Sequence, residues 1–262
     1  MSELFIETRG RGEAHIVLLH GWAMSGAVFA PLVERLEQRC TLHLVDLPGH
    51  GRSRDSTVSL TARDCARAIT QAMPRALWLG WSLGGVIALQ AALDFPEQVR
   101  ALAMLDSTPR FVRSEDWPHA ISPEILQQFA ADLRADHRGT LERFLALEAL
   151  GSDCAKEDLR RLRHDALTDD PPPVRALCEG LDVLEHTDLR ARLHELDQPS
   201  VWIAGRRDRL VPWQAMQWSA HECNGTFNRI EGGGHAPFIG HADEVMAALQ
   251  PLLEREQADL PS

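Results

Sequence analysis

The stretch that most constrains the fold is Gly80-x-Ser82-x-Gly84, which stands between two apolar runs. The run 76–79 has the length and composition of a strand buried on both faces, and 86–92 suits a buried helix. A serine on a sharp strand-to-helix turn needs small residues two positions before and after it, because strand and helix pass closely there. The pattern predicts a nucleophile elbow, although a glycine-rich turn without chemistry has the same residues.

Two backbone N–H groups are candidates to bind an oxyanion formed beside Ser82. A helix that begins after this serine points its free N–H groups and the positive end of its dipole at that place, so the first donor is Leu83 N–H. The strand 14–19 runs into a His-Gly pair and Trp22, where esterases with such an elbow place the second donor. We assign this donor to the Trp22 N–H and expect its indole to line the acyl pocket; the alternative is an ordinary core aromatic.

Two later segments supply partners for the serine in the order Ser, Asp, His. The strand 200–204 is followed by Asp208, ahead of a helix that starts with proline. The last strand, 226–230, leads into a glycine-rich loop that can bend back over the sheet edge and carries His235. We predict that His235 removes the Ser82 proton and that Asp208 holds the imidazole tautomer. Water then hydrolyses the acyl-enzyme.

The order of apolar runs indicates an α/β fold with one insertion. Strands and helices alternate up to residue 106 and again from residue 189, which is typical of a mostly parallel sheet with helices on both faces. Between 107 and 188 helical periodicity dominates and no strand-like run occurs. We expect one core, 1–106 with 189–262, and an inserted all-helical lid, 107–188, that shapes the substrate pocket.

Two local patterns predict details of this architecture. The strands 4–9 and 14–19 are separated by Gly10-Arg11-Gly12, which predicts a hairpin turn between them. The run 169–173, Asp-Asp-Pro-Pro-Pro, cannot be helical and predicts a break between lid helices.

Composition bounds the location and the partners. With 27 Lys+Arg against 38 Asp+Glu, the formal charge of −11 disfavours nucleic acid and anionic membranes. No run reaches about 18 apolar residues and residues 1–12 do not resemble a signal peptide, so we expect a cytoplasmic protein. We also expect a monomer. The five cysteines are scattered and odd in number, which favours free thiols. We expect no cofactor and no metal, because His235 and His241 lack helical ligand spacing and a nearby acid.

The chain resembles the α/β-hydrolase superfamily over its whole length, and within it the carboxylesterases of biotin synthesis. The similar segments are 17–22, 41–49, 78–85, 142–147 and 235–238. The most specific are Trp-Leu-Gly-Trp-Ser-Leu-Gly-Gly at 78–85 and Arg-Phe-Leu-Ala-Leu at 143–147. The resemblance implies an α/β-hydrolase fold and a pimeloyl methyl ester substrate on acyl-carrier protein, whose hydrolysis frees the distal carboxylate and methanol.

The resemblance also implies substrate contacts and a carrier-docking surface. The contacts are Trp22, Ser82, Leu83, Phe144, Leu145, Ala146, Leu147, Glu148 and His235. A similar family member has glutamine where Glu148 stands, so a charge there can alter the pocket. Acyl-carrier protein is acidic and needs cations near the pocket mouth. We hypothesise a basic face made of Arg138, Arg143, Lys156 and Arg160; the alternative is an ordinary solvated helix surface.

Other functions remain open to the same residues. A broad carboxylesterase or a hydrolase of carbon–carbon bonds uses the same Ser-His-Asp site. A ligand receptor with little turnover can also be built on this fold. Dehalogenase and epoxide hydrolase activities are disfavoured, because those enzymes need a carboxylate where Ser82 stands.

Overall fold

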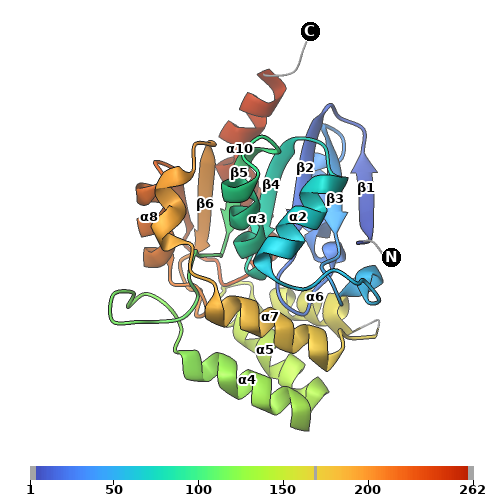
Figure 1. Ribbon diagram of the computed structural model, residues 1–262, viewed down its shortest axis with the longest axis vertical. Coiled ribbons are helices and arrows are strands. Elements are labelled where there is room, and N and C mark those ends of the chain that lie inside the picture. Colours follow the sequence, from blue (N-terminus) through green and yellow to red (C-terminus); the bar gives the residue numbers. More distant parts are fainter. Residues whose placement is uncertain (1–3, 168–169, 259–262) are drawn as a thin grey trace.

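The computed structural model describes residues 4–167 and 170–258 and is organised around a seven-stranded sheet (Figure 1). The strands are β1 Ile6–Gly10, β2 Ala14–Leu19, β3 Cys40–Val45, β4 Ala76–Trp81, β5 Val99–Leu105, β6 Ser200–Gly205 and β7 Thr226–Ile230. Their order in the sheet is β1-β3-β2-β4-β5-β6-β7, and only β1 runs antiparallel to its neighbour. The predicted mostly parallel sheet is therefore confirmed.

Helices cover both faces of this sheet. The longer ones outside the insertion are α1 Ala30–Leu36, α2 Ala62–Ala72, α3 Leu83–Asp94, α8 Trp213–Glu222 and α10 Ala242–Ala258. Short helices are η1 Gly26–Phe29, η2 Gly51–Ser53, η3 Arg190–Glu195 and α9 Pro237–Gly240. Side chains alternate along β4, so Trp78 packs with α2, α3 and α8 while Leu77 and Leu79 pack with α1 and α10. Every residue of β4 and β6 is buried, as expected for strands covered on both faces.

The predicted hairpin between the first two strands is wrong. β3 lies between β1 and β2, pairing antiparallel with β1 and parallel with β2. The glycine turn packs against the chain that enters β3: a Cβ on Gly12 would lie 1.9 Å from the Arg39 carbonyl oxygen, and one on Gly10 2.1 Å from that of Cys40. The turn reverses the chain direction between β1 and β2 as predicted. These two strands do not pair with each other, because β3 lies between them.

Four helices of the insertion lie together over the carboxyl ends of the parallel strands (Figure 1). They are α4 Pro123–Ala135, α5 His137–Ala149, α6 Ala155–Leu167 and α7 Val174–His186. The segment before α4 is irregular, with isolated bridges Val112↔Ile121 and Ser114↔Trp117. The predicted break falls between α6 and α7. Residues 1–3 and 259–262 of the predicted core, and 168–169 of the predicted lid and break, lie outside the described residues.

Within residues 4–167 and 170–258, no helix combines the length and the apolar character needed to cross a bilayer.

Candidate active site

Ser82 occupies a strained turn between β4 and α3. Its φ of 53° and ψ of −119° are unusual for a residue with a Cβ and cost about 1–3 kcal/mol. The flanking glycines are required sterically: a Cβ on Gly80 would lie 2.4 Å from the Gly84 oxygen, and one on Gly84 2.1 Å from the Leu19 oxygen. The turn is held by a hydrogen bond from the Ser107 hydroxyl to the Ser82 carbonyl, 2.7 Å. This geometry places the serine hydroxyl at the carboxyl edge of the sheet.

The structure brings the three predicted residues into one hydrogen-bonded chain. His235 Nε2 lies 2.9 Å from Ser82 Oγ, and His235 Nδ1 lies 2.7 Å from Asp208 Oδ2. The other oxygen of Asp208 accepts the backbone N–H groups of Leu210 and Val211, at 2.7 and 3.1 Å. A carboxylate only accepts hydrogen bonds, so Nδ1 carries the imidazole proton and Nε2 is free to accept the serine proton. All three side chains are buried.

Two hydrogen bonds to the backbone of His235 fix the loop that carries it. The Trp81 indole N–H donates to the His235 carbonyl at 2.7 Å, and the His235 N–H donates to the Glu148 carbonyl at 3.2 Å. Sequence reasoning missed the role of Trp81. A buried tryptophan beside the serine was a usable signal, because its N–H needs an acceptor.

The two candidate oxyanion donors come from different parts of the fold. Leu83 begins α3, and Trp22 lies on the loop after β2. Among the described residues, neither backbone N–H donates a hydrogen bond within the protein. The Trp22 indole is buried, donates to the Leu177 carbonyl at 2.8 Å, and meets the Phe144 ring edge-on at 4.5 Å between centroids. The Trp22 side chain therefore connects the core to α5 and α7.

His20 orders the loop before Trp22 and was also missed. Its Nδ1–H donates to the Gly21 carbonyl at 2.8 Å, and its Nε2 accepts the Leu47 N–H at 2.9 Å. Burial lowers the pKa of His20 to about 4, so the ring stays neutral and Nε2 remains an acceptor at neutral pH.

Comparison with known proteins places this architecture. A family model described as alpha/beta hydrolase fold matches residues 14–242. The chain belongs to the α/β-hydrolase family. It is 56% identical to the pimeloyl-[acyl-carrier protein] methyl ester esterase of Stenotrophomonas maltophilia (strain R551-3), over 94% of this chain and 95% of that one. It is 54% identical to the protein of the same name from Xanthomonas campestris pv. campestris (strain B100), over 94% of this chain and 97% of that one. The family resemblance inferred from the motifs is confirmed.

Solved structures confirm the fold. The esterase EaEST from Exiguobacterium antarcticum superposes with a TM-score of 0.86 at 19% identity, covering 96% of this chain and 95% of the other. The bromoperoxidase from Bacillus anthracis gives 0.86 at 20% identity, with 96% and 95% covered. At this identity the likeness concerns the fold alone.

In this α/β-hydrolase, the five predicted contacts on α5 do not face one direction. Phe144 packs on Trp22, whereas Leu145 lies in the hydrophobic cluster formed with α1 and α10. Ala146 is exposed and Leu147 is half-buried. Consecutive helical residues point about 100° apart, so these five side chains lie on different sides of α5.

Glu148 is a buried acid close to Asp208. Its side chain is 0% exposed, and neither carboxyl oxygen has a hydrogen-bond partner among the described residues. Burial, followed by the charge of Asp208, raises the pKa of Glu148 well above its usual value. Burial therefore favours the neutral acid at this position, and a neutral acid is closer in charge to glutamine than an ionised glutamate is.

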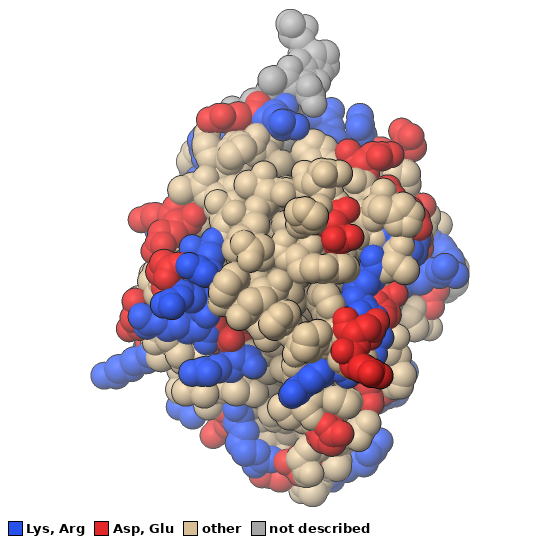
Figure 2. Space-filling view, turned by 90° about the vertical axis from the view of Figure 1, so that its left-hand side faces the viewer, with Lys and Arg blue, Asp and Glu red and all other residues tan. Residues whose placement is uncertain are grey.

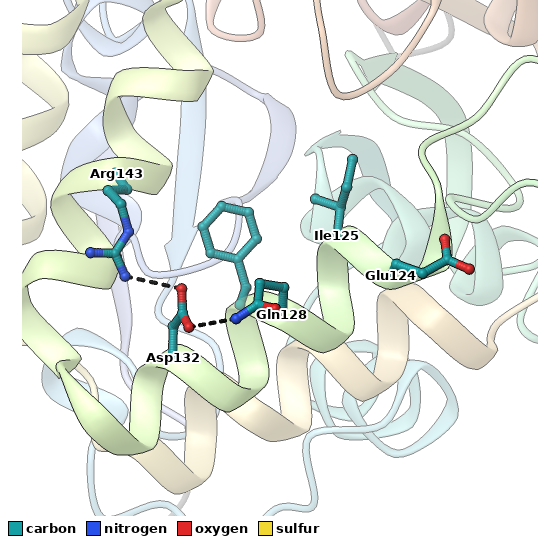
Figure 3. A pocket seen from close by; sticks show the side chains of 6 residues that line it. Glu124, Ile125, Gln128, Asp132 and Arg143 are labelled. Atoms are coloured by element: carbon teal, nitrogen blue, oxygen red, sulfur yellow. Dashed lines mark hydrogen bonds and ion pairs between the residues drawn. The ribbon is translucent and has the colours of Figure 1, made fainter.

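A pocket of about 310 Å³ opens between α4 and α5 (Figure 3). Its lining residues are Glu124, Ile125, Gln128, Phe129, Asp132 and Arg143. Asp132 accepts hydrogen bonds from Arg143 at 3.2 Å and from Gln128 at 2.7 Å. The Phe129 ring meets Phe144 at 5.5 Å, and Phe144 in turn meets Trp22. Three aromatic rings, Phe129, Phe144 and Trp22, therefore connect this surface pocket to the loop after β2.

The four predicted docking cations lie on α5 and α6 and are exposed. Arg138 pairs with Glu142 at 3.5 Å and Arg160 with Glu157 at 2.5 Å. Arg143 bridges Asp132 and Asp136, both on or beside α4. In Figure 2 the insertion forms the lower end of the molecule, and side chains of both signs appear there. The arginines are thus neutralised locally rather than gathered into an unpaired basic surface.

The prediction that His241 lacks a nearby acid is wrong. His241 does have nearby acids: its ring nitrogens lie 2.8 Å from Asp153 and 2.9 Å from Glu244. Asp153 is 88 positions away in the chain, so the sequence could not reveal this contact. Both ring nitrogens of His241 therefore contact carboxylates. These contacts explain why Asp153, His241 and Glu244 lie together.

Proposed function

We propose that this chain is a serine esterase that hydrolyses a pimeloyl methyl ester carried on acyl-carrier protein, releasing methanol. The Ser82–His235–Asp208 hydrogen-bonded chain carries the proposal. The substrate in this proposal is taken from the two bacterial relatives, whose name specifies it and which align over 95–97% of their length. The agreement thus extends well beyond the catalytic motifs.

The proposed reaction starts with proton transfer from Ser82 Oγ to His235 Nε2 while Oγ attacks the ester carbonyl carbon. Asp208 stabilises the imidazolium that forms. The negative oxygen is bound by the N–H groups of Leu83 and Trp22, and one such donor contributes about 10²–10³-fold in rate. His235 then returns its proton to the departing methoxide, so methanol leaves. Water, deprotonated by the same histidine, attacks the acyl-enzyme and releases the free carboxylate.

We infer that residues 107–188 act as a lid on a core of 1–106 and 189–262. Ser82 is 3% exposed and His235 1%, so a substrate held on another protein reaches the serine only after covering side chains move. Phe144 and Phe129, on α5 and α4, are the rings between Trp22 and the surface pocket. Movement of these two helices admits the acyl chain, and their return excludes water during the reaction.

We further propose that Arg138, Arg143, Lys156 and Arg160 contact the acidic carrier. Arg143 supports this role because it lines the pocket between α4 and α5. The carrier's carboxylates can take over the pairing that Asp132 and Asp136 now provide. We also propose that the protein is cytoplasmic and monomeric and has no nucleic-acid or membrane partner.

The docking proposal predicts a substrate-selective defect. Arg143→Glu with Arg160→Glu lowers kcat/KM for the carrier-bound ester about tenfold or more and leaves a short free ester unaffected, because only the carrier presents a negative surface. Arg67→Glu on α2 is the matched control, since Arg67 pairs with Asp64 at the same i,i+3 spacing as Arg160 with Glu157. Equal loss on both substrates, or the same effect in the control, contradicts docking.

Hydrolysis of a short p-nitrophenyl ester tests the serine chemistry itself. The wild-type protein is expected to turn over many times, and Ser82→Ala to lose at least about 10⁴-fold in kcat. Turnover that survives in Ser82→Ala places the chemistry elsewhere and contradicts the proposal.

A further inference from the structure

A second buried acid lies beside the proposed triad and has no part in the mechanism above. Asp106 follows the last residue of β5, with φ of 41° and 0% of its surface exposed. Its Oδ1 accepts the Gly205 N–H at 2.7 Å. Its Oδ2 is buried and has no hydrogen-bond partner among the described residues. The Gly205 N–H thus satisfies the hydrogen-bonding capacity of Oδ1, but the burial of Oδ2 has no such explanation.

The sheet places this acid next to Asp208. β5 and β6 are parallel neighbours, and the Asp106 N–H donates to the Ile203 carbonyl at 2.9 Å. Asp106 comes directly after β5 and Asp208 shortly after β6, so both carboxyl groups emerge at the same edge. One side-chain atom from each of Asp106, Asp208 and His235 lies within 4.8 Å of the other two.

Two carboxyl groups so close together in a buried site cannot both be ionised. Burial, followed by the charge of Asp208, raises the pKa of Asp106 well above its usual value. Oδ1 of Asp208 accepts two backbone N–H groups and Oδ2 accepts from His235 Nδ1, so both oxygens of Asp208 already act as acceptors. Asp106 is therefore the protonated member of the pair. Because Oδ1 already accepts a hydrogen bond, the proton belongs on Oδ2.

We propose that Asp106 is a positioning residue and reserve acid: its protonated carboxyl hydrogen-bonds to Asp208, and when Asp208 is neutral it ionises and supplies the negative charge beside His235. The proposal rests on the serine-esterase function inferred above. In the second state Asp106 releases its proton to solvent, and its carboxylate stabilises the imidazolium that forms when Ser82 is deprotonated. The titratable groups around this pair are Asp208, His235 and, acting on Asp208, Glu148.

Four proteins test this inference by hydrolysis of a short p-nitrophenyl ester: wild type, Asp106→Asn, Asp208→Asn and the double variant. The asparagine at 106 keeps both the acceptor for Gly205 and a donor towards Asp208, so kcat falls less than about tenfold. In Asp208→Asn, kcat falls only about 10²-fold. In the double variant kcat falls about 10⁴-fold, which is the loss typical of a triad without its carboxylate. The residual activity of Asp208→Asn also rises with pH as Asp106 ionises, and this rise is absent from the double variant.

Non-additivity is the decisive result. If Asp106→Asn lowers kcat by the same factor in both backgrounds, Asp106 only caps Gly205 and the proposal is overturned. A measurement that does not depend on catalysis distinguishes failure of this proposal from failure of the proposed esterase function. In the infrared spectrum at pH 7, Asp106→Asn is expected to remove one carbonyl band of a protonated carboxylic acid, with Glu148→Gln removing another as the reference. Absence of any such loss in Asp106→Asn overturns the proposal whatever the protein hydrolyses.

Discussion

Replacing Glu148 by glutamine should stabilise the protein, and the gain should grow with pH. The folded protein keeps a proton on this buried carboxyl, whereas the unfolded chain releases it above its ordinary pKa of 4.5. The unfolded state therefore binds fewer protons, so rising pH lowers the free energy of unfolding of the wild type until the pH reaches the raised folded pKa. Glutamine has no proton to lose, and the variant lacks this slope.

The magnitude follows from the width of the pH interval. Each pH unit above the unfolded pKa lowers the wild-type free energy of unfolding by about 1.4 kcal/mol. Between the unfolded pKa and the raised folded pKa, the stability difference between Glu148→Gln and wild type should thus increase by about 1.4 kcal/mol per pH unit. The glutamine NH₂ also lacks a buried partner, but this cost is the same at every pH and does not alter the slope.

Urea unfolding at several pH values between 5 and 8 measures this difference. Glu142→Gln is the matched control, because Glu142 lies on the same helix but is partly exposed and pairs with Arg138. Its stability difference from wild type should stay nearly constant with pH. Parallel curves for Glu148→Gln and wild type would show that the buried carboxyl titrates normally, and the argument from burial would then be refuted.

Two further substitutions test the supports of the site. Trp81→Phe keeps the ring but removes the donor to the His235 carbonyl, so it should cost about 1–3 kcal/mol in urea unfolding and lower kcat; unchanged kcat would show that this bond does not position the histidine. Gly84→Ala puts a Cβ 2.1 Å from the Leu19 oxygen, which forces the elbow apart. It should abolish ester turnover and lower the thermal midpoint, and a variant with wild-type turnover would contradict the steric argument.

Local chemistry explains why much of the site could be located from the sequence. Ser82 and His235 stand beside glycines that the backbone requires, and Asp208 follows a buried strand. Each signal lies within a few residues of the side chain concerned. The parallel sheet was equally accessible, because strands buried on both faces form continuous apolar runs.

Features that depend on contacts between residues far apart in the chain could not be predicted from the sequence. The place of β3 between β1 and β2 depends on pairing across about 30 residues, and a local glycine turn cannot reveal it. Asp106 and Glu148 gain their significance only from tertiary burial beside Asp208. The five α5 residues were assigned as one run, but helix geometry places Phe144 against Trp22, Leu145 in the core and Ala146 in solvent.

The central claim is tested most directly by incubating the protein with the pimeloyl methyl ester of acyl-carrier protein and following the mass of the carrier. Wild type should remove the methyl group with multiple turnovers and release methanol, whereas Ser82→Ala should leave the carrier unchanged. If wild type leaves the methylated carrier intact while still cleaving short esters through Ser82, the serine chemistry stands and the proposed substrate is wrong.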